Sequence, residues 1–240
     1  MEQPKNIFNP NILFLDIETV SAQPDFGSVP ERLKPLWLNK AKYIFPEGHD
    51  LESGYFERAA IYAEFAKVIV IGLGFLYENE QKELCFKTKT IHGHNEKEIL
   101  IAFSELLHSK FKSKNLQLCA HNGKEFDFPF LCRRYIANQL PLPKVLNISG
   151  FKPWEVPHLD TMEMWRFGDK KAYTSLELLA ATLDVPTSKG DIDGSKVNTA
   201  YYLEKNLDAI AEYCQRDVAV LAQIYQRLTG GTLPVNQTVV

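Results

Sequence analysis

The chain has 240 residues, of which 45% are hydrophobic and 12% are aromatic. That composition can bury a large core and excludes a disordered chain, and the length suits one domain with insertions. The formal net charge is −3, whereas proteins that hold long duplexes by their backbone phosphates are usually basic. A nucleic-acid function would therefore depend on a local basic groove, or on metal ions that recruit the phosphate.

The chain contains no apolar run as long as a membrane span, and its first residues lack the charged-then-apolar pattern of a secretion signal. Its four cysteines form no Cys-x-x-Cys pair, and three of them lie in apolar runs. This pattern favours buried free thiols over disulfides or a zinc site. We expect a cytoplasmic protein that does not associate with a membrane.

The first predicted element is a buried strand, because residues 11–20 form an almost continuous apolar run with a β-branched end. Residues 21–54 are proline-rich and irregular, with one short helix expected at 31–40. We interpret them as an insertion over the sheet within a single domain of residues 1–240. Residues 55–65 then have the apolar spacing of a helix.

Two further strands are predicted at 67–77 and 83–88, and their short connection favours antiparallel pairing. Asn95 is the expected N-cap of a helix that runs to about residue 110. The apolar residues 116–120 predict another strand.

The second half of the chain is mainly helical by its pattern. Its expected elements are a turn at 121–123, a helix over 125–138, a loop at 144–157, a short strand at 158–161, a helix from a Thr174 or Ser175 cap to 183, a polar loop at 186–194, and a helix from about 206 that stops before Gly230 and Gly231. The first three strands can form a meander, and the fourth, reached through a helix, can lie parallel to the first. This order resembles the ribonuclease H-like fold, an α/β architecture with three layers, α/β/α, around a mixed central sheet.

Asp16 and Glu18 are two residues apart in the first predicted strand. Their side chains therefore point to the same face, about 7 Å apart along the chain. Two acids on one face of a central strand are poorly tolerated without compensation, which a divalent cation can supply. The alternative is that the strand ends at Leu15 and Asp16 opens a turn.

Asp127 falls in the first turn of the helix predicted after the fourth strand. An acid in this position is also explained by the helix dipole, without any metal. The longer string Asn122-x-x-x-Phe126-Asp127 is more specific than the single acid.

Tyr213 and Asp217 are four residues apart on the last predicted helix, so they share a face at the edge of its apolar stripe. The alternative for Asp217 is an ion pair with Arg216 or Lys205. Each of the three acidic strings is weak alone, but their order, contexts and separations form a strong joint signal.

The strings DIET, NxxxFD and YxxxD resemble the three exonuclease motifs of the proofreading domains of family B DNA polymerases. Those domains belong to the DEDD superfamily of 3′–5′ exonucleases, in its tyrosine-bearing branch (DEDDy). In the sister branch a histidine takes the position that is Glu212 here. The resemblance spans residues 12–228, and segments 173–179 and 191–195 also resemble a bacterial group of stand-alone predicted exonucleases.

The resemblance implies hydrolysis of phosphodiester bonds at the 3′ ends of single-stranded nucleic acid, with DNA favoured, releasing nucleoside 5′-monophosphates. Its catalytic residues would be Asp16, Glu18, Asp127, Tyr213 and Asp217, with the four carboxylates holding two Mg²⁺ or Mn²⁺ ions. Asp16 would bridge both ions. Glu18 and Asp217 would hold the ion that binds the attacking water, and Asp127 would hold or orient the second. Tyr213 would orient the water, because a pKa of about 10 makes it a poor base.

The candidate substrate contacts are Thr19, Asn122, Phe126, Lys171 and Tyr173. Lys171 and Tyr173 belong, with Arg166 and Lys170, to the best basic and aromatic cluster for a single strand, although a solvated loop is the simpler explanation. His121 is a rival candidate for activating the water.

Two other functions remain open from the sequence. One is a 3′–5′ exonuclease that acts on RNA, since the contacts that read a 2′-hydroxyl cannot be identified from the sequence. The other is a non-catalytic nucleic-acid-binding module of the same fold.

Overall fold

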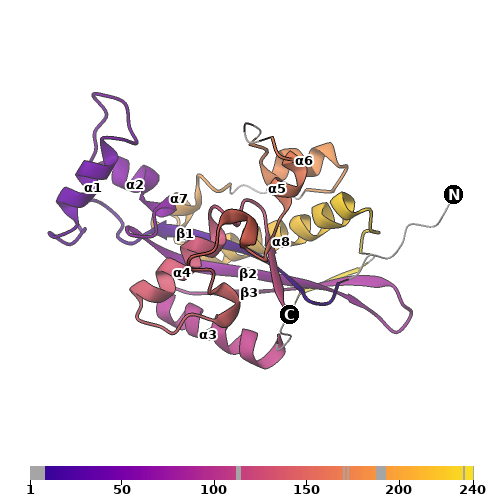
Figure 1. Cartoon of the computed structure of the whole chain (residues 1–240). Coiled ribbons are helices and arrows are strands. Elements are labelled where there is room, and N and C mark those ends of the chain that lie inside the picture. The colour runs from indigo at the N-terminus through magenta and orange to yellow at the C-terminus, as the bar shows by residue number, and fades with distance from the viewer. Residues whose placement is uncertain are drawn as a thin grey trace.

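The computed structural model describes residues 9–111, 115–169, 171, 173–187, 193–234 and 236–239. Its centre is a six-stranded sheet in the order β5-β4-β1-β2-β3-β6 (Figure 1). The strands are β1 (Ile12–Ser21), β2 (Ala66–Glu78), β3 (Leu84–His92), β4 (Gln117–Ala120), β5 (Leu159–Asp160) and β6 (Asn236–Val239). β1, β2 and β3 form an antiparallel meander, β4 is parallel to β1, β5 to β4, and β6 to β3.

Helices cover both faces of this sheet. They are α1 (Lys34–Ala41), α2 (Gly54–Arg58), α3 (Glu96–Lys110), α4 (Asp127–Ala137), α5 (Thr161–Arg166), α6 (Leu176–Thr182), α7 (Val197–Tyr202) and α8 (Leu207–Thr229), with short 3₁₀ turns η1 (Ala59–Ile61), η2 (Lys144–Leu146) and η3 (Pro153–Glu155). α3 and α4 pack on one face and α8 on the other (Figure 1). The predicted three-layer α/β/α fold with a mixed sheet is confirmed.

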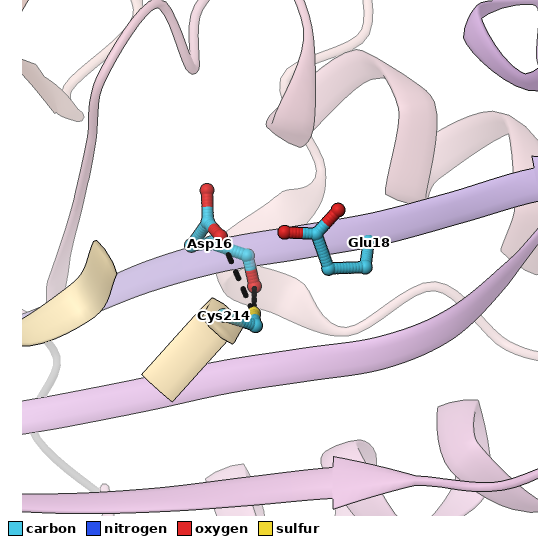
Figure 2. Close-up of side chains that lie close together, drawn as sticks. All are labelled: Asp16, Glu18 and Cys214. Atoms are coloured by element: carbon cyan, nitrogen blue, oxygen red, sulfur yellow. Dashed lines mark hydrogen bonds between the residues drawn. The ribbon is translucent and has the colours of Figure 1, made fainter. Parts of the chain in front are cut away.

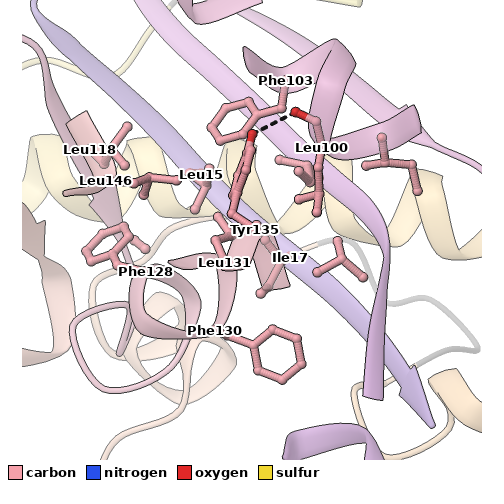
Figure 3. Packing of buried hydrophobic residues seen from close by; sticks show 14 of the residues in the cluster. Leu15, Ile17, Leu100, Phe103, Leu118, Phe128, Phe130, Leu131, Tyr135 and Leu146 are labelled. Carbon is pink, nitrogen blue, oxygen red and sulfur yellow. Dashed lines mark hydrogen bonds between the residues drawn. The ribbon is translucent and has the colours of Figure 1, made fainter. Parts of the chain in front are cut away.

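The side chains of β1 alternate between the two layers. Leu13, Leu15 and Ile17 belong to the core beneath α3 and α4, and Figure 3 shows Leu15 and Ile17 near aromatic side chains of those helices. Ile12 and Phe14 belong instead to the core beneath α8. Each such burial contributes about 1.5–3 kcal/mol, so the register of this strand is strongly fixed.

Two glycines of β2 let α8 approach the sheet closely. A Cβ atom on Gly72 would lie 2.7 Å from Cys214 Sγ, and one on Gly74 would lie 2.9 Å from Val218 Cγ1. Gly72 is also the register partner of Asp16 on β1. Because glycine has no side chain, the middle of α8 can lie next to the middle of β1.

The segment between β1 and β2 has a small core of its own, formed by Val29, Trp37, Ala41, Tyr55, Ala59 and Phe65. Figure 1 shows its helices α1 and α2 beyond one end of the sheet. Two polar contacts tie it to β1. The Thr19 hydroxyl donates to the Ala60 carbonyl at 2.8 Å, and Asn198 of α7 accepts from Ser21 N at 3.0 Å while donating to the Phe56 carbonyl at 2.7 Å.

Some local predictions differ from the structure. The helix expected at 55–65 is shorter, because α2 ends at Arg58 and only a 3₁₀ turn follows. α5, α7 and β6 were not expected. The two helices have six residues each and are too short to show a helical period, and the four side chains of β6 are exposed and do not alternate. Residues 188–192 of the predicted polar loop lie outside the described residues.

A buried ion pair fastens α3, α4 and β2 together. The Glu96 carboxylate accepts hydrogen bonds from Val68 N at 2.8 Å, from Arg134 Nε at 2.8 Å and Nη2 at 2.6 Å, and from Asn138 Nδ2 at 2.7 Å. Arg134 Nη1 also donates to the Ala63 carbonyl at 2.7 Å. Both charged groups therefore have hydrogen-bond partners, and each one neutralises the charge of the other.

Replacing Arg134 with Met would leave the Glu96 carboxylate buried without its counter-charge. We expect the free energy of unfolding, measured by urea denaturation, to fall by about 3–5 kcal/mol. The control is Glu31→Gln, which removes an exposed ion pair with Lys34 and should change stability by less than about 1 kcal/mol. Equal effects of the two substitutions would contradict the prediction.

Candidate active site

Asp16 and Glu18 lie on the side of β1 that faces α8, where apolar residues come before them. Ile12 and Phe14 precede them on that side and pack in the core. Single ligand atoms of Asp16, Glu18 and Cys214 lie within 4.8 Å of one another. Figure 2 shows the Glu18 carboxylate directed toward Asp16. The strand continues past both acids, so Asp16 does not open a turn.

Asp127 reaches β1 just beyond the end of its pairing with β4. The β4 register stops at Phe14, and further along β1 the Ile17 N–H donates to Asp127 Oδ1 at 3.2 Å. Asp127 is the first residue of α4 and is 3% exposed. Its carboxylate thus contacts the backbone between Asp16 and Glu18, in addition to lying at a helix N-terminus.

Tyr213 and Asp217 lie one turn apart on α8, and the interaction of their side chains lowers the pKa of Asp217. The nearby Arg216 guanidinium lowers the pKa of Asp217, although less than burial raises it. Among the described residues Asp217 forms no ion pair with Arg216 or Lys205. Tyr213 is its neighbour on the same face of α8.

Burial is the main cause of a raised pKa at all four carboxyls. The charges of Asp127 and Asp217 add to the burial effect at Asp16, and those of Asp16, Asp217 and Asp127 add to it at Glu18. Burial raises the pKa of Asp127 to about 7 and that of Asp217 to about 6, even though hydrogen bonds to both lower it. The four groups therefore share one electrostatic environment that disfavours negative charge.

These residues fit divalent cations. Glu18 is 7% exposed, and no described residue donates a hydrogen bond to its carboxylate. Carboxylate oxygens are hard ligands of the kind that Mg²⁺ and Mn²⁺ prefer. Asp127 and Asp217 act on the site through their charge, but they lie outside the group of described ligand atoms within 4.8 Å. Asp16 and Glu18 therefore form the centre of the carboxylate cluster.

Asp160 is a structural acid that the sequence interpretation missed. Its carboxylate accepts from the backbone N–H groups of Asn122 and Lys124, both at 3.0 Å, and it caps α5 through Met162 N at 3.0 Å and Glu163 N at 3.2 Å. It therefore holds the turn before Asp127 against α5. The signal was present as Asp-x-x-Glu, the pattern of a helix N-terminus.

Both ring nitrogens of His121 have partners. Nε2 lies 2.8 Å from the Thr174 carbonyl, to which it can only donate, and Nδ1 lies 2.9 Å from the Thr161 hydroxyl. Burial lowers the pKa of His121, which favours the neutral ring. The histidine joins α5 to the segment before α6 and has no free nitrogen to activate a water.

Two of the candidate substrate contacts, Thr19 and Phe126, have side-chain partners within the protein. The Thr19 hydroxyl bonds to Ala60, and the Phe126 ring packs 5.2 Å from that of Phe130. Asn122 has a left-handed backbone with φ 61°, and its buried Oδ1 has no partner among the described residues. It lines a pocket of about 290 Å³, together with Lys124, Phe151 and Arg166. Of Thr19, Phe126 and Asn122, only Asn122 has a buried polar side-chain atom without a partner among the described residues.

Lys171 and Tyr173 are both exposed, Tyr173 by 70%, on the segment between α5 and α6. Phe167, one residue past α5, is 91% exposed and has a left-handed backbone with φ 45°. Lys170 lies outside the described residues. A role of Lys171 and Tyr173 in substrate binding stays a prediction.

The sequence model of the RNase H superfamily matches residues 56–229. The chain belongs to this superfamily. The matched range includes Asp127, Tyr213 and Asp217, whereas β1 with Asp16 and Glu18 precedes it. Membership supports a nuclease activity in general.

A similar fold occurs in the family B DNA polymerase from the hyperthermophilic archaeon Pyrobaculum calidifontis. The two structures align with a TM-score of 0.54 and 13% sequence identity over 91% of this chain and 24% of the polymerase chain. This chain therefore spans about a quarter of that protein, and the likeness is one of fold. No curated protein sequence matches the chain. No helix within the described ranges is long and apolar enough to cross a membrane.

The raised pKa values predict how the stability of the metal-free protein depends on pH. A carboxyl whose pKa is higher in the folded than in the unfolded state stabilises the fold fully below its unfolded pKa of about 3.9, and this contribution is lost as the pH rises through the folded value. For Asp217 and Asp127 the folded values are about 6 and about 7. We expect the melting temperature in chelator to fall between about pH 4 and pH 7.

Calorimetry with and without Mn²⁺ would test this. The ion should raise the melting temperature more at the higher pH, where the carboxylates are charged. The control is Asp127→Asn, which should flatten the profile in chelator. A wild-type profile in chelator that is already flat would contradict the prediction.

Proposed function

We propose that this chain is a metal-dependent 3′–5′ exonuclease of the tyrosine-bearing DEDD branch. It would hydrolyse phosphodiester bonds at 3′ ends of single-stranded nucleic acid, with DNA favoured, and release nucleoside 5′-monophosphates. The observation that carries the proposal is the convergence of Asp16, Glu18 and Asp127 with the Tyr213–Asp217 turn of α8 around the middle of β1. A single domain of residues 1–240 with an insertion at 21–54 belongs to the same proposal, as does a cytoplasmic location.

The carboxylates have distinct tasks in this reaction. Asp16, at the centre, would bridge two Mg²⁺ or Mn²⁺ ions, while Glu18 and Asp217 would hold one ion and Asp127 the other. When bound, the ions would neutralise the scissile phosphate and increase the acidity of water. The negative charge that burial disfavours would then be matched by positive charge.

Tyr213 would orient the attacking water through its hydroxyl. Burial and the charges of Asp217, Glu18 and Asp16 raise its pKa, so it remains a protonated hydrogen-bond donor and not a base. Glu212, which stands where the sister branch has histidine, is 73% exposed and lies 3.9 Å from Arg216. Its exposure supports assignment to the tyrosine branch.

Asn122 and the segment with Lys171 and Tyr173 are the proposed contacts to the strand. Asn122 lines a pocket beside the turn before Asp127, where it could contact a base or a sugar. The exposed Tyr173 ring can stack on a base. Thr19 and Phe126 would contribute through backbone position and local packing, since their side chains already have partners.

Substitutions within the cluster separate catalysis from folding. We expect Asp16→Asn and Asp217→Asn each to lower kcat by at least about 10²–10³-fold, and Tyr213→Phe by about 10²-fold. The assay would digest 5′-labelled and 3′-labelled single-stranded DNA, duplex DNA and RNA in Mg²⁺, Mn²⁺ and chelator. Shortening of 5′-labelled strands one nucleotide at a time would identify the polarity.

The matched control is Glu212→Gln, which lies beside Tyr213 on α8 but is exposed, and which should keep its activity. The melting temperature of Asp16→Asn in chelator should not fall, because the substitution removes a repelling charge. Metal-dependent cleavage that survived in Asp16→Asn and Asp217→Asn would overturn the proposal. Tight binding of 3′ ends with no turnover in either ion would favour the non-catalytic module, and faster cleavage of RNA would favour the RNA-directed enzyme.

Tyr173→Ala should weaken the binding of single strands and leave the chemical step intact. Loss of one stacked base costs about 1–3 kcal/mol, so KM should rise by about 5-fold to 100-fold with little change in kcat. Steady-state kinetics on a single-stranded oligonucleotide would measure both constants, and Tyr43→Ala, on the insertion, provides an exposed tyrosine for comparison. An unchanged KM in Tyr173→Ala would assign this segment to the solvated surface.

A further inference from the structure

A thiol belongs to the carboxylate cluster. Cys214 follows Tyr213 on α8, and its Sγ donates to Asp16 Oδ2 at 3.3 Å and lies 3.5 Å from the Asp16 carbonyl oxygen (Figure 2). The atoms that Asp16, Glu18 and Cys214 offer to a metal all lie within 4.8 Å of one another. Within the described ranges this is the only group of three or more such side chains, and it is not made of oxygen alone.

The spacing is close to that of a tetrahedral metal site. A Zn–S bond of about 2.3 Å and a Zn–O bond of about 2.1 Å at a tetrahedral angle separate sulfur and oxygen by about 3.6 Å. The observed distance between Cys214 Sγ and Asp16 Oδ2 is 3.3 Å. Glu18 can offer a third ligand atom, since it is almost fully buried, its carboxylate is directed toward Asp16, and no described residue donates a hydrogen bond to it.

The packing holds the thiol in this position. Gly72 lies opposite Asp16 in the register of β1 and β2, and a Cβ atom there would come within 2.7 Å of Cys214 Sγ. A side chain at this position would therefore displace the sulfur or all of α8. The other cysteines are placed differently: Cys132, for example, donates to the Leu146 carbonyl at 3.1 Å beneath the opposite face of the sheet.

We propose that Asp16, Glu18 and Cys214 form a mixed oxygen–sulfur site for a borderline or soft divalent cation, such as Zn²⁺ or Cd²⁺. Binding forms a metal–sulfur bond and releases the thiol proton to solvent, while the two carboxylates bind as anions. Thiolate selects Zn²⁺ and softer ions, whereas Mg²⁺ avoids sulfur and leaves the thiol protonated. Both classes of ion would therefore bind the same carboxylates, but only the softer ions would also bind the sulfur.

One consequence rests on the proposed exonuclease function. An ion held by Cys214 occupies Asp16, the carboxylate proposed to bridge two ions, so it would compete with Mg²⁺ and stop the reaction. Binding itself rests on the geometry alone and requires no nucleic acid.

Cadmium provides the direct test, because a bond between Cd²⁺ and thiolate gives an ultraviolet charge-transfer band that bonds to oxygen do not give. Titration of the full chain with Cd²⁺ should produce this band at one equivalent of metal. Cys214→Ser should abolish the one-equivalent band, while the control Cys132→Ser should retain it. Asp16→Asn should weaken Cd²⁺ binding by at least about tenfold, as expected on loss of a ligand or its partner.

The activity test compares, for each variant, the rate with added Zn²⁺ with the rate of the same variant in Mg²⁺ alone. The variants therefore do not need to have equal rates in Mg²⁺. Zn²⁺ added to the Mg²⁺ reaction should inhibit the wild type and Cys132→Ser at concentrations at least about tenfold lower than those that inhibit Cys214→Ser. A band of the same intensity and stoichiometry in Cys214→Ser would overturn the site. So would a band that does not weaken in Asp16→Asn, because that result would indicate an isolated thiol.

The two proposals can fail separately. A band that depends on Cys214 and Asp16, in a protein that cleaves no nucleic acid, would keep the mixed site and remove the exonuclease. Robust cleavage with a band that persists in Cys214→Ser would keep the exonuclease and remove the mixed site.

Discussion

The burial of four carboxylates between β1, α4 and α8 is the constraint on which the rest of the structure depends. Each group has a pKa raised mainly by burial, and no buried cation among the described residues neutralises the cluster. Such an arrangement destabilises the metal-free fold at neutral pH. It can persist because the surrounding core is large: β1 is buried against α3 and α4 on one face and against α8 on the other.

The same core also fixes the positions of the acidic side chains. β1 is a central strand, and the apolar residues at 12–15 fix its register, so Asp16 and Glu18 must face α8. α8 in turn is held by Val218 and Cys214 against two glycines of β2. Packing and chemistry are therefore coupled: a change of volume in this part of the core would move Asp217 relative to Asp16, because both depend on the same contact.

The sequence predicted the parts of this site that follow from local periodicity. Strand alternation placed Asp16 and Glu18 together, and helical spacing placed Tyr213 with Asp217. The pairing of β1 with β2, β2 with β3 and β4 with β1 could also be derived, because a short connection and a helical crossover determine how these strands pair. Asp127 was ambiguous for a physical reason. Its approach to Ile17 depends on where β4 stops pairing with β1, and this contact joins residues 110 positions apart.

What the sequence could not supply is the role of groups that act through tertiary contacts. Asp160 carries no feature of a functional acid, yet its four backbone hydrogen bonds set the turn before Asp127. The sequence pattern predicts buried free thiols and no ligand role for Cys214, since sulfur packs well in a core. Its position beside Asp16 arises because Gly72, far away in sequence, leaves space there. Cys214, an ordinary core residue by its sequence pattern, thus becomes a potential metal ligand. The oxygens of the cluster suit hard ions, and its sulfur allows it to bind softer ions as well.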